Sequence, residues 1–216
     1  MSDLLLENER KQVIEYGKKL INQDLTTGTG GNISVYNPEK ELMAISPSGI
    51  DYFQIEVEDV VIMDLNGNIV EGDNKPSSEY EMHRIFYDKR DDVNAVVHTH
   101  SMYATTISCT RKNLPAVHYM IAVAGIEVPC AKYATFGSDK LAKNAYQSMG
   151  QEKNATLLAN HGLVAVGESL SEAFNVAREI EYVSEIYYRT QSMGDSKILP
   201  ENEMKHVLEK FKTYGQ

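Results

Sequence analysis

One short run of the chain, Ala95-Val96-Val97-His98-Thr99-His100, most restricts what the chain can fold into. Three apolar residues lead into two histidines and predict a strand that ends at the pair. Residues two apart on a strand point to the same face, so both imidazoles can reach one point in space, as a metal ion requires. The pair alone leaves two interpretations open, because a polar pair on a solvent-facing strand has the same spacing.

The elements predicted around this strand form one domain over residues 1–216. Apolar residues at helical spacing predict helices over 4–23, 76–89, 138–149 and 171–191, and another from 201 into the tail. Strand-like runs lie at 33–36, 42–45, 60–63, 68–71, 95–100, 126–129, 155–159 and 163–166. Strands clustered in the middle, with flanking helices, predict a layered α+β domain around a mixed, largely antiparallel sheet. The strict alternation of a Rossmann domain is absent.

Composition excludes several classes of protein. The 216 residues allow one domain with a substantial core, and 42% hydrophobic and 24% charged residues are typical of a soluble globular protein. A net charge of −10 without a basic run argues against nucleic-acid binding, and the apolar stretches are too short to span a bilayer. The first residues lack the pattern of a signal peptide, and Cys109 and Cys130 form no Cys-x-x-Cys motif. We therefore expect a cytoplasmic protein with two reduced thiols.

The remaining histidines are candidates for a third ligand beside His98 and His100. His161 lies at a tight turn between two apolar strand runs and is the strongest of them, although the spacing alone leaves its role evenly open. For the other three we favour an ordinary core, hydrogen-bonding or solvated role. They are His83, His118 and His206.

Glu79 directly follows two serines at a predicted helix start. Locally, the better interpretation is a carboxylate that complements the helix dipole and caps the amino end. The alternative is a general base presented near a metal.

Three hydroxyl-rich turns, at 27–32, 46–49 and 77–78, are candidates for a neutral phosphate pocket in a protein whose overall charge repels anions. The glycine-rich turn at 27–32 lacks the ending of a nucleotide P-loop and the spacing of a dinucleotide fingerprint. A plain helix-to-strand turn is therefore at least as well supported an interpretation as a phosphate-binding nest.

Taken together, strings spread over nearly the whole chain resemble the class II, zinc-dependent aldolase/epimerase family. The strings are Gly28-Thr29-Gly30-Gly31-Asn32-Ile33-Ser34, Ser46-Pro47-Ser48-Gly49-Ile50, Pro76-Ser77-Ser78-Glu79, Ala95-Val96-Val97-His98-Thr99-His100, Tyr133-Ala134-Thr135-Phe136-Gly137 and Ala159-Asn160-His161-Gly162-Leu163. Two more, Pro115-Ala116-Val117-His118-Tyr119-Met120-Ile121-Ala122 and the tail Phe211-Lys212-Thr213-Tyr214-Gly215, are closer to the fuculose-phosphate branch of that family.

The resemblance implies a three-layer α/β/α domain of the class II aldolase/adducin-like fold, in a homotetramer with active sites between subunits. It implies reversible cleavage of L-fuculose 1-phosphate to dihydroxyacetone phosphate and L-lactaldehyde, through an enediolate stabilised by one Zn²⁺ per subunit. Glu79 would be the catalytic acid/base and could also touch the metal. Tyr119 would act on the aldehyde half in a neighbouring subunit, and Tyr214 would close over the site. The implied metal ligands are His98, His100 and His161. The implied phosphate-binding residues are Thr29, Asn32, Ser48, Gly49, Ser77 and Ser78.

Several alternatives share this residue set. Within the family they are a rhamnulose-type aldolase, a pentulose-phosphate 4-epimerase and a methylthioribulose-phosphate dehydratase. The epimerases carry an aspartate at the position of Glu79, which favours the aldolase. A non-catalytic, adducin-like module has no need of the three histidines. A zinc hydrolase usually has an acidic residue or a third histidine close behind the pair, where this chain reads Ser101-Met102-Tyr103.

Overall fold

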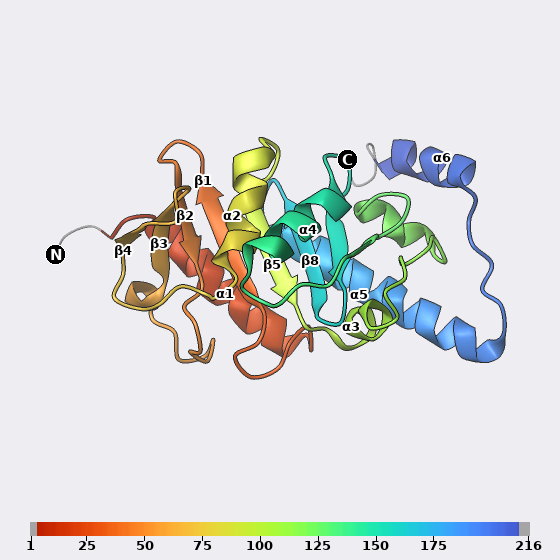
Figure 1. Ribbon diagram of the computed structural model, residues 1–216, viewed down its shortest axis with the longest axis horizontal. Coiled ribbons are helices and arrows are strands. Elements are labelled where there is room, and N and C mark those ends of the chain that lie inside the picture. Colours follow the sequence, from red (N-terminus) through yellow and green to blue (C-terminus); the bar gives the residue numbers. More distant parts are fainter. Residues whose placement is uncertain (1–3, 212–216) are drawn as a thin grey trace.

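The computed structural model describes residues 4–211, and the eight strands in this range join one sheet (Figure 1). They are β1 (Asn32–Asn37), β2 (Leu42–Ile45), β3 (Val61–Asp64), β4 (Ile69–Glu71), β5 (Ala95–Thr99), β6 (Cys130–Ala131), β7 (Ala155–Leu158) and β8 (Gly162–Gly167). Their order is β4-β3-β2-β1-β5-β8-β7-β6, and every neighbouring pair is antiparallel except the parallel pair β6 and β7. The predicted mixed, largely antiparallel sheet is confirmed.

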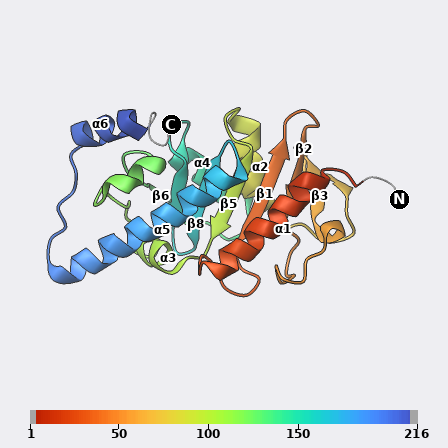
Figure 2. The same ribbon diagram turned by 180° about the vertical axis from the view of Figure 1, so that it is seen from behind.

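Helices cover both faces of the sheet. Figure 1 shows α2 (Tyr80–Lys89) and α4 (Asp139–Met149) in front of it, and Figure 2 shows α1 (Glu7–Asn22) and α5 (Leu170–Met193) crossing the opposite face. The short helix α3 (Met102–Ser108) packs against α5, while α6 (Glu201–Phe211) follows a long connection. Two 3-10 turns complete the elements, η1 (Val57–Asp59) and η2 (Tyr119–Val123). The three-layer arrangement is thus confirmed. Among residues 4–211, no helix is both long and apolar enough to cross a bilayer.

Alternating residues of the central strands fill two separate cores. Ile33 and Val97 lie in the core beneath α1 and α5, whereas Val96 lies in the core beneath α2 and α4. Because side chains alternate along a strand, His98 and Asn32 lie on the α2 face. They are direct partners across the β1–β5 pair. The alternation therefore brings polar side chains together at one end of the α2 face.

The predicted strand at 126–129 is wrong. The strand in this region is Cys130–Ala131, and Val128 makes only an isolated bridge with Leu114. Pro129 lies between the two, and a proline has no N–H to donate to a sheet. Pairing with β7 therefore continues on the carboxyl side of Pro129, whose carbonyl accepts from the Leu157 N–H at 2.8 Å.

Helix α3 has no counterpart among the predicted elements. Its seven residues include Thr105, Thr106 and Ile107, whose β-branched side chains disfavour a helix. The first turn is instead held from α5, where the Glu181 carboxylate accepts hydrogen bonds from the backbone N–H of Tyr103 and of Ala104, both at 2.8 Å. This helix depends on a contact between residues far apart in the sequence, and a local pattern does not reveal it.

Candidate active site

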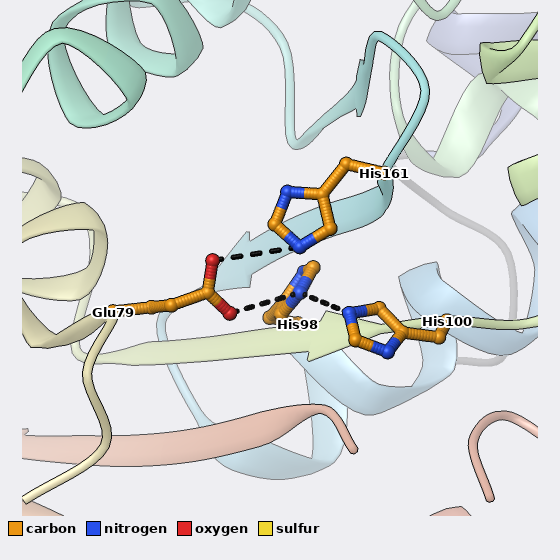
Figure 3. Close-up of side chains that lie close together, drawn as sticks. All are labelled: Glu79, His98, His100 and His161. Carbon is orange, nitrogen blue, oxygen red and sulfur yellow. Dashed lines mark hydrogen bonds and ion pairs between the residues drawn. The ribbon is translucent and has the colours of Figure 1, made fainter. Parts of the chain in front are cut away.

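Three segments meet where β5 ends. His98 and His100 come from the end of β5, His161 from the turn between β7 and β8, and Glu79 from the residue directly before α2 (Figure 3). One ligand atom from each of these four residues lies within 4.8 Å of the other three. The structure thus brings the predicted ligand set and the predicted acid/base to one point.

The hydrogen bonding of His98 leaves one ring nitrogen available to the cluster. The ring is fully buried, and its Nδ1 lies 2.8 Å from the carbonyl oxygen of Leu163 on β8. A carbonyl only accepts, so Nδ1 carries the proton and the lone pair of Nε2 faces the other ligands. A backbone carbonyl behind the ring is a common partner of a metal-binding histidine.

Glu79 does not cap α2 in the way that its local sequence favours. Although it is the residue that precedes the first turn, its side chain makes no capping hydrogen bond. Its carboxylate turns to the histidines, with Oε2 at 3.3 Å from His98 Nε2 and Oε1 at 3.5 Å from His161 Nε2 (Figure 3). Oε1 is buried and has no hydrogen-bond partner among the described residues. An unpaired buried carboxylate oxygen is costly, which indicates a site built for a further ligand or proton.

The local field keeps these groups in the protonation states that metal binding requires. Burial alone would raise the pKa of the Glu79 carboxyl, but His98, His161 and a hydrogen bond from Asn32 outweigh it, and the pKa lies well below its ordinary value. Burial lowers the pKa of His100 and of His161 to about 4, with a further contribution from His98. At neutral pH, Glu79 is therefore an anion and both imidazoles are neutral.

The donor set fits a divalent metal ion. In a tetrahedral site with nitrogen ligands at about 2.0–2.1 Å, neighbouring ligand atoms lie roughly 3.4 Å apart. The neighbouring distances here are 3.0 Å between His98 Nε2 and His100 Nε2, with 3.3 and 3.5 Å from His98 and His161 to Glu79. Three imidazoles and a carboxylate suit zinc among the common metals.

Gly162 has no side chain, and this allows the backbone to pack closely against the cluster. A Cβ at this position would lie 2.2 Å from the carbonyl oxygen of Thr99 and about 3.3 Å from the rings of His98 and His100. The glycine after His161 is therefore required for β8 to approach the end of β5 this closely.

A cavity of about 390 Å³ opens beside the cluster. His100, His161 and Glu79 line it, together with all six of the predicted phosphate-binding residues: Thr29, Asn32, Ser48, Gly49, Ser77 and Ser78. Two of the hydroxyl-rich turns are joined through their backbones, since Ser77 N–H donates to Ser46 O at 3.0 Å and Pro47 bridges to Pro76. In the described part of the chain, no lysine or arginine lines this cavity.

Asn32 occupies a different place from that of a simple phosphate ligand. Its side chain is buried, with Nδ2 at 3.0 Å from Glu79 Oε2 and Oδ1 at 2.5 Å from His83 Nε2. Both polar ends of the amide are therefore engaged by protein groups. A direct phosphate contact from this side chain stays a prediction.

Among the lining residues that the sequence did not single out as site residues are three with larger side chains, Tyr133, Phe136 and Asn160. The exposed fractions of Tyr133 and Phe136 are 53% and 67%, which is large for aromatic side chains. Arg111 lies near Tyr133 and Asn160. Its guanidinium carbon is 5.8 Å from the Tyr133 ring centroid, and its Nε donates to Asn160 Oδ1 at 2.8 Å. The aromatic residues that precede Gly137 in the sequence could have indicated this rim, but a sequence does not show whether their side chains are exposed.

Tyr119, one of the two predicted tyrosines, does not line this cavity. Tyr119 lies on η2 with 48% of its surface exposed, against the His118 ring and near Phe211. Tyr214 lies outside the described residues. The roles of both tyrosines stay predictions.

The other histidines take the ordinary roles expected of them. His83 is fully buried and hydrogen-bonded, His206 is exposed on α6, and His118 precedes η2, where its Nδ1 accepts from Met120 N–H at 3.3 Å.

A family model, the class II aldolase and adducin N-terminal domain, matches residues 11–188. The chain belongs to this family. A similar class II aldolase is the 5-deoxy-D-ribulose 1-phosphate aldolase of Bacillus thuringiensis serovar kurstaki, 53% identical over 99% of this chain and 100% of its own. The L-fuculose phosphate aldolase of Escherichia coli is 40% identical over 95% of this chain and 94% of its own. A solved L-fuculose 1-phosphate aldolase superposes with a TM-score of 0.95 at 50% identity, over 98% of this chain and 100% of that one.

These likenesses extend over nearly the whole chain, so they concern the complete class II aldolase fold and not one motif. The enzyme keeps all three histidines and Glu79 in one cluster, which argues against a non-catalytic module on the same fold. Class II aldolases depend on a metal, and the Glu/His₃ cluster is where this one would hold it.

Proposed function

We propose that this class II aldolase reversibly cleaves a ketose 1-phosphate between its third and fourth carbons, giving dihydroxyacetone phosphate and a short aldehyde. The observation that carries the proposal is the position of the Glu79 carboxylate, within 3.3–3.5 Å of two imidazoles and on the edge of a cavity lined by hydroxyl-rich turns. This arrangement supports a reaction in which a base, a metal-binding cluster and a polar pocket act on one substrate.

Glu79 is the acid/base of the proposed reaction. In the cleavage direction the hydroxyl on the fourth carbon gives its proton to solvent through the Tyr119 phenol, and the bond between the third and fourth carbons breaks. Glu79 takes up a proton from solvent and delivers it to the third carbon. In synthesis, Glu79 removes that proton from the hydroxymethyl carbon of dihydroxyacetone phosphate. The unpaired Oε1 is the atom available for this transfer, because Oε2 already accepts from Asn32.

His98, His100 and His161 would hold one Zn²⁺. When bound, the ion acts as a Lewis acid that stabilises the enediolate charge, so that no lysine Schiff base is needed. The neutral rings of His100 and His161 are suited to this role, and the bond from His98 Nδ1 to Leu163 O fixes the orientation of the most buried ring.

The phosphate would bind among Thr29, Ser48, Gly49, Ser77 and Ser78. These residues line the cavity beside the cluster and offer hydroxyl and backbone donors without a formal charge. The exposure of Tyr119 is consistent with an arrangement between subunits. Because Tyr119 is exposed and outside its own chain's cavity, we propose that it protonates the aldehyde oxygen in a neighbouring subunit of a homotetramer, and that Tyr214 closes over that site.

The first substrate to test is 5-deoxyribulose 1-phosphate, because the 5-deoxy-D-ribulose 1-phosphate aldolase of Bacillus thuringiensis is 53% identical over 99% of this chain. Its cleavage would release acetaldehyde, an apolar fragment that suits the aromatic rim formed by Tyr133 and Phe136. L-Fuculose 1-phosphate is the second candidate, supported by the 50% identical solved structure. Its aldehyde fragment, L-lactaldehyde, carries one more hydroxyl group that the same rim must accommodate.

The test is cleavage of both ketose phosphates, coupled to reduction of the dihydroxyacetone phosphate released, with zinc-loaded protein before and after a strong chelator. We expect cleavage that the chelator abolishes and zinc restores, with a higher kcat/KM for 5-deoxyribulose 1-phosphate. A higher kcat/KM for L-fuculose 1-phosphate would transfer the assignment to the second candidate. Failure of the zinc-loaded protein to cleave either compound would contradict the proposed reaction.

A further inference from the structure

A row of buried polar side chains runs from the interior of the α2 face to Glu79. Tyr87 OH lies 2.5 Å from Ser34 Oγ, which lies 2.7 Å from His83 Nδ1. His83 Nε2 lies 2.5 Å from Asn32 Oδ1, and Asn32 Nδ2 lies 3.0 Å from Glu79 Oε2. All five side chains are buried. The proposed mechanism uses only the last of them.

Each hydrogen bond in this row has one possible direction. The Glu79 carboxylate only accepts, so the Asn32 amide must present its NH₂ to Oε2 and its oxygen to His83. His83 Nε2 must then carry a proton and donate it to Asn32 Oδ1. A neutral ring with a proton on Nε2 has a lone pair on Nδ1, which accepts from the hydroxyl of Ser34. The oxygen of Ser34 in turn accepts from Tyr87.

The surroundings support both ends of this assignment. Burial, with a contribution from His98, lowers the pKa of His83 to about 3, so the ring is neutral at pH 7. Burial raises the pKa of Tyr87 far above its ordinary value, so its phenol keeps the proton that it donates. The ring of Tyr87 is also held in place by stacking on Tyr36, with centroids 5.0 Å apart.

We propose that His83 is a positioning residue for Glu79, which deepens and rests on the acid/base role given to Glu79 above. By donating from Nε2, it holds the Asn32 amide with its NH₂ toward Glu79 Oε2. A flipped amide would set oxygen against oxygen and push the carboxylate away. The row thereby fixes Oε2 and leaves Oε1 directed at the histidines and the cavity.

The first test reads the proton on His83 directly. Two-bond ¹⁵N–¹H correlations of the zinc-loaded, ¹⁵N-labelled protein distinguish an Nε2–H ring from an Nδ1–H ring, and the signals are assigned from their loss in His83→Gln. We expect the Nε2–H tautomer for His83. An Nδ1–H tautomer would overturn the inference, because Asn32 would then lack the donor that sets its orientation.

The second test separates positioning from packing. His83→Phe keeps a ring but removes the donor, and we expect kcat to fall about 10- to 100-fold with little change in KM and with one zinc ion retained per chain. His83→Gln can donate from its own Nε2 and should restore most of kcat. The control is Phe86→Leu, a buried apolar change on the same helix whose side chain makes none of the hydrogen bonds of the row.

Three results would contradict the positioning role. They are an unchanged kcat in His83→Phe, a loss of zinc from that variant, and a failure of His83→Gln to restore kcat.

The tautomer measurement needs no substrate. If the protein cleaved neither ketose phosphate, the proposed function would fail while the tautomer could still be read. An active enzyme with an Nδ1–H ring would contradict only the role of His83.

Discussion

The two faces of the central sheet are built from the same strands and are filled very differently. Toward α1 and α5, neighbouring strand residues such as Ile33 and Val97 form a continuous apolar core. Toward α2, the residues next to them, Asn32 and His98, are polar. Asn32 donates to the Glu79 carboxylate, and His98 donates to the carbonyl of Leu163. Both faces have an apolar core, but at the end of the α2 face apolar burial gives way to the polar residues that hold the chemistry.

The α2 face shows how such a loss is limited. A buried polar group costs free energy unless it is paired, and a partly satisfied network is worse than an apolar core. Asn32, Ser34 and His83 have partners at every polar side-chain position described above, while Glu79 Oε1 has none. Among these four residues, the unsatisfied atom therefore lies at the point where substrate and metal are proposed to bind.

The largest effect that separates the faces is expected from His98→Ala. Removing the most buried imidazole should abolish stoichiometric zinc binding and lower kcat/KM by at least about 10³-fold, because the Lewis acid is lost. Metal analysis after gel filtration, with the cleavage assay, measures both effects. The control is His206→Ala, on the exposed side of α6, which should keep the metal and the activity. A variant at His98 that kept one zinc ion per chain would remove this residue from the ligand set.

Glu79→Gln should have the next largest effect. The amide cannot take up a proton, so exchange of the hydroxymethyl proton of dihydroxyacetone phosphate with solvent should slow about 10²- to 10⁴-fold. Zinc content should stay at one ion per chain, because three histidines remain. Exchange in deuterated buffer, followed by NMR, measures this step without the aldehyde. Exchange at the native rate would exclude Glu79 as the base.

On the opposite face, Ile33→Ala is expected to affect stability and not chemistry. Ile33 lies between Asn32 and Ser34 in the sequence, but its fully buried side chain points into the α1–α5 core. The truncation should lower the free energy of unfolding by about 2–5 kcal/mol. Urea unfolding measures the loss, and kcat should stay within a factor of about 2 in buffer without urea. A large fall in kcat for the folded protein would break the division between the two faces.

The smallest effect concerns the response to pH. The pKa of His83 is lowered to about 3 by burial, against 6.5 for an exposed histidine. The unfolded chain therefore binds one more proton than the folded one between these values, so the contribution of His83 is complete above pH 6.5 and is lost as the pH falls toward 3. Metal-free protein should lose roughly 1 kcal/mol per pH unit between pH 6 and pH 4 that His83→Gln does not lose. Equal slopes in urea titrations of the two proteins would contradict a buried, neutral His83.

Much of this organisation could be predicted from local pattern. The β-branched run before His98 indicated the strand, and its period of two placed both imidazoles on one side, as the cluster requires. The long apolar periodicity of 171–191 likewise marked α5 within two residues of its observed ends, Leu170 and Met193. These features are encoded by neighbouring residues, which is why a single sequence reveals them.

Features that depend on distant residues could not be predicted in the same way. The local sequence favoured Glu79 as a helix cap, but His98, His161 and Asn32 turn its carboxylate into the cluster. Nothing near His83 in the sequence indicates that it contacts Asn32, which lies 51 residues away. Such contacts follow from the pairing of β1 with β5 and from the docking of α2, and only the assembled fold shows them.

Among the described residues, no lysine or arginine lines the cavity, and this has a consequence for how substrate arrives. A chain with a net charge of −10 repels a phosphate dianion at long range, whereas Arg111, which contacts Asn160 and Tyr133 beside the cavity, attracts it only over a short distance. Added salt shortens the reach of that repulsion to about 10 Å at 0.1 M. Moderate ionic strength should therefore speed the encounter with substrate, the reverse of the slowing seen in enzymes that capture phosphates with basic side chains.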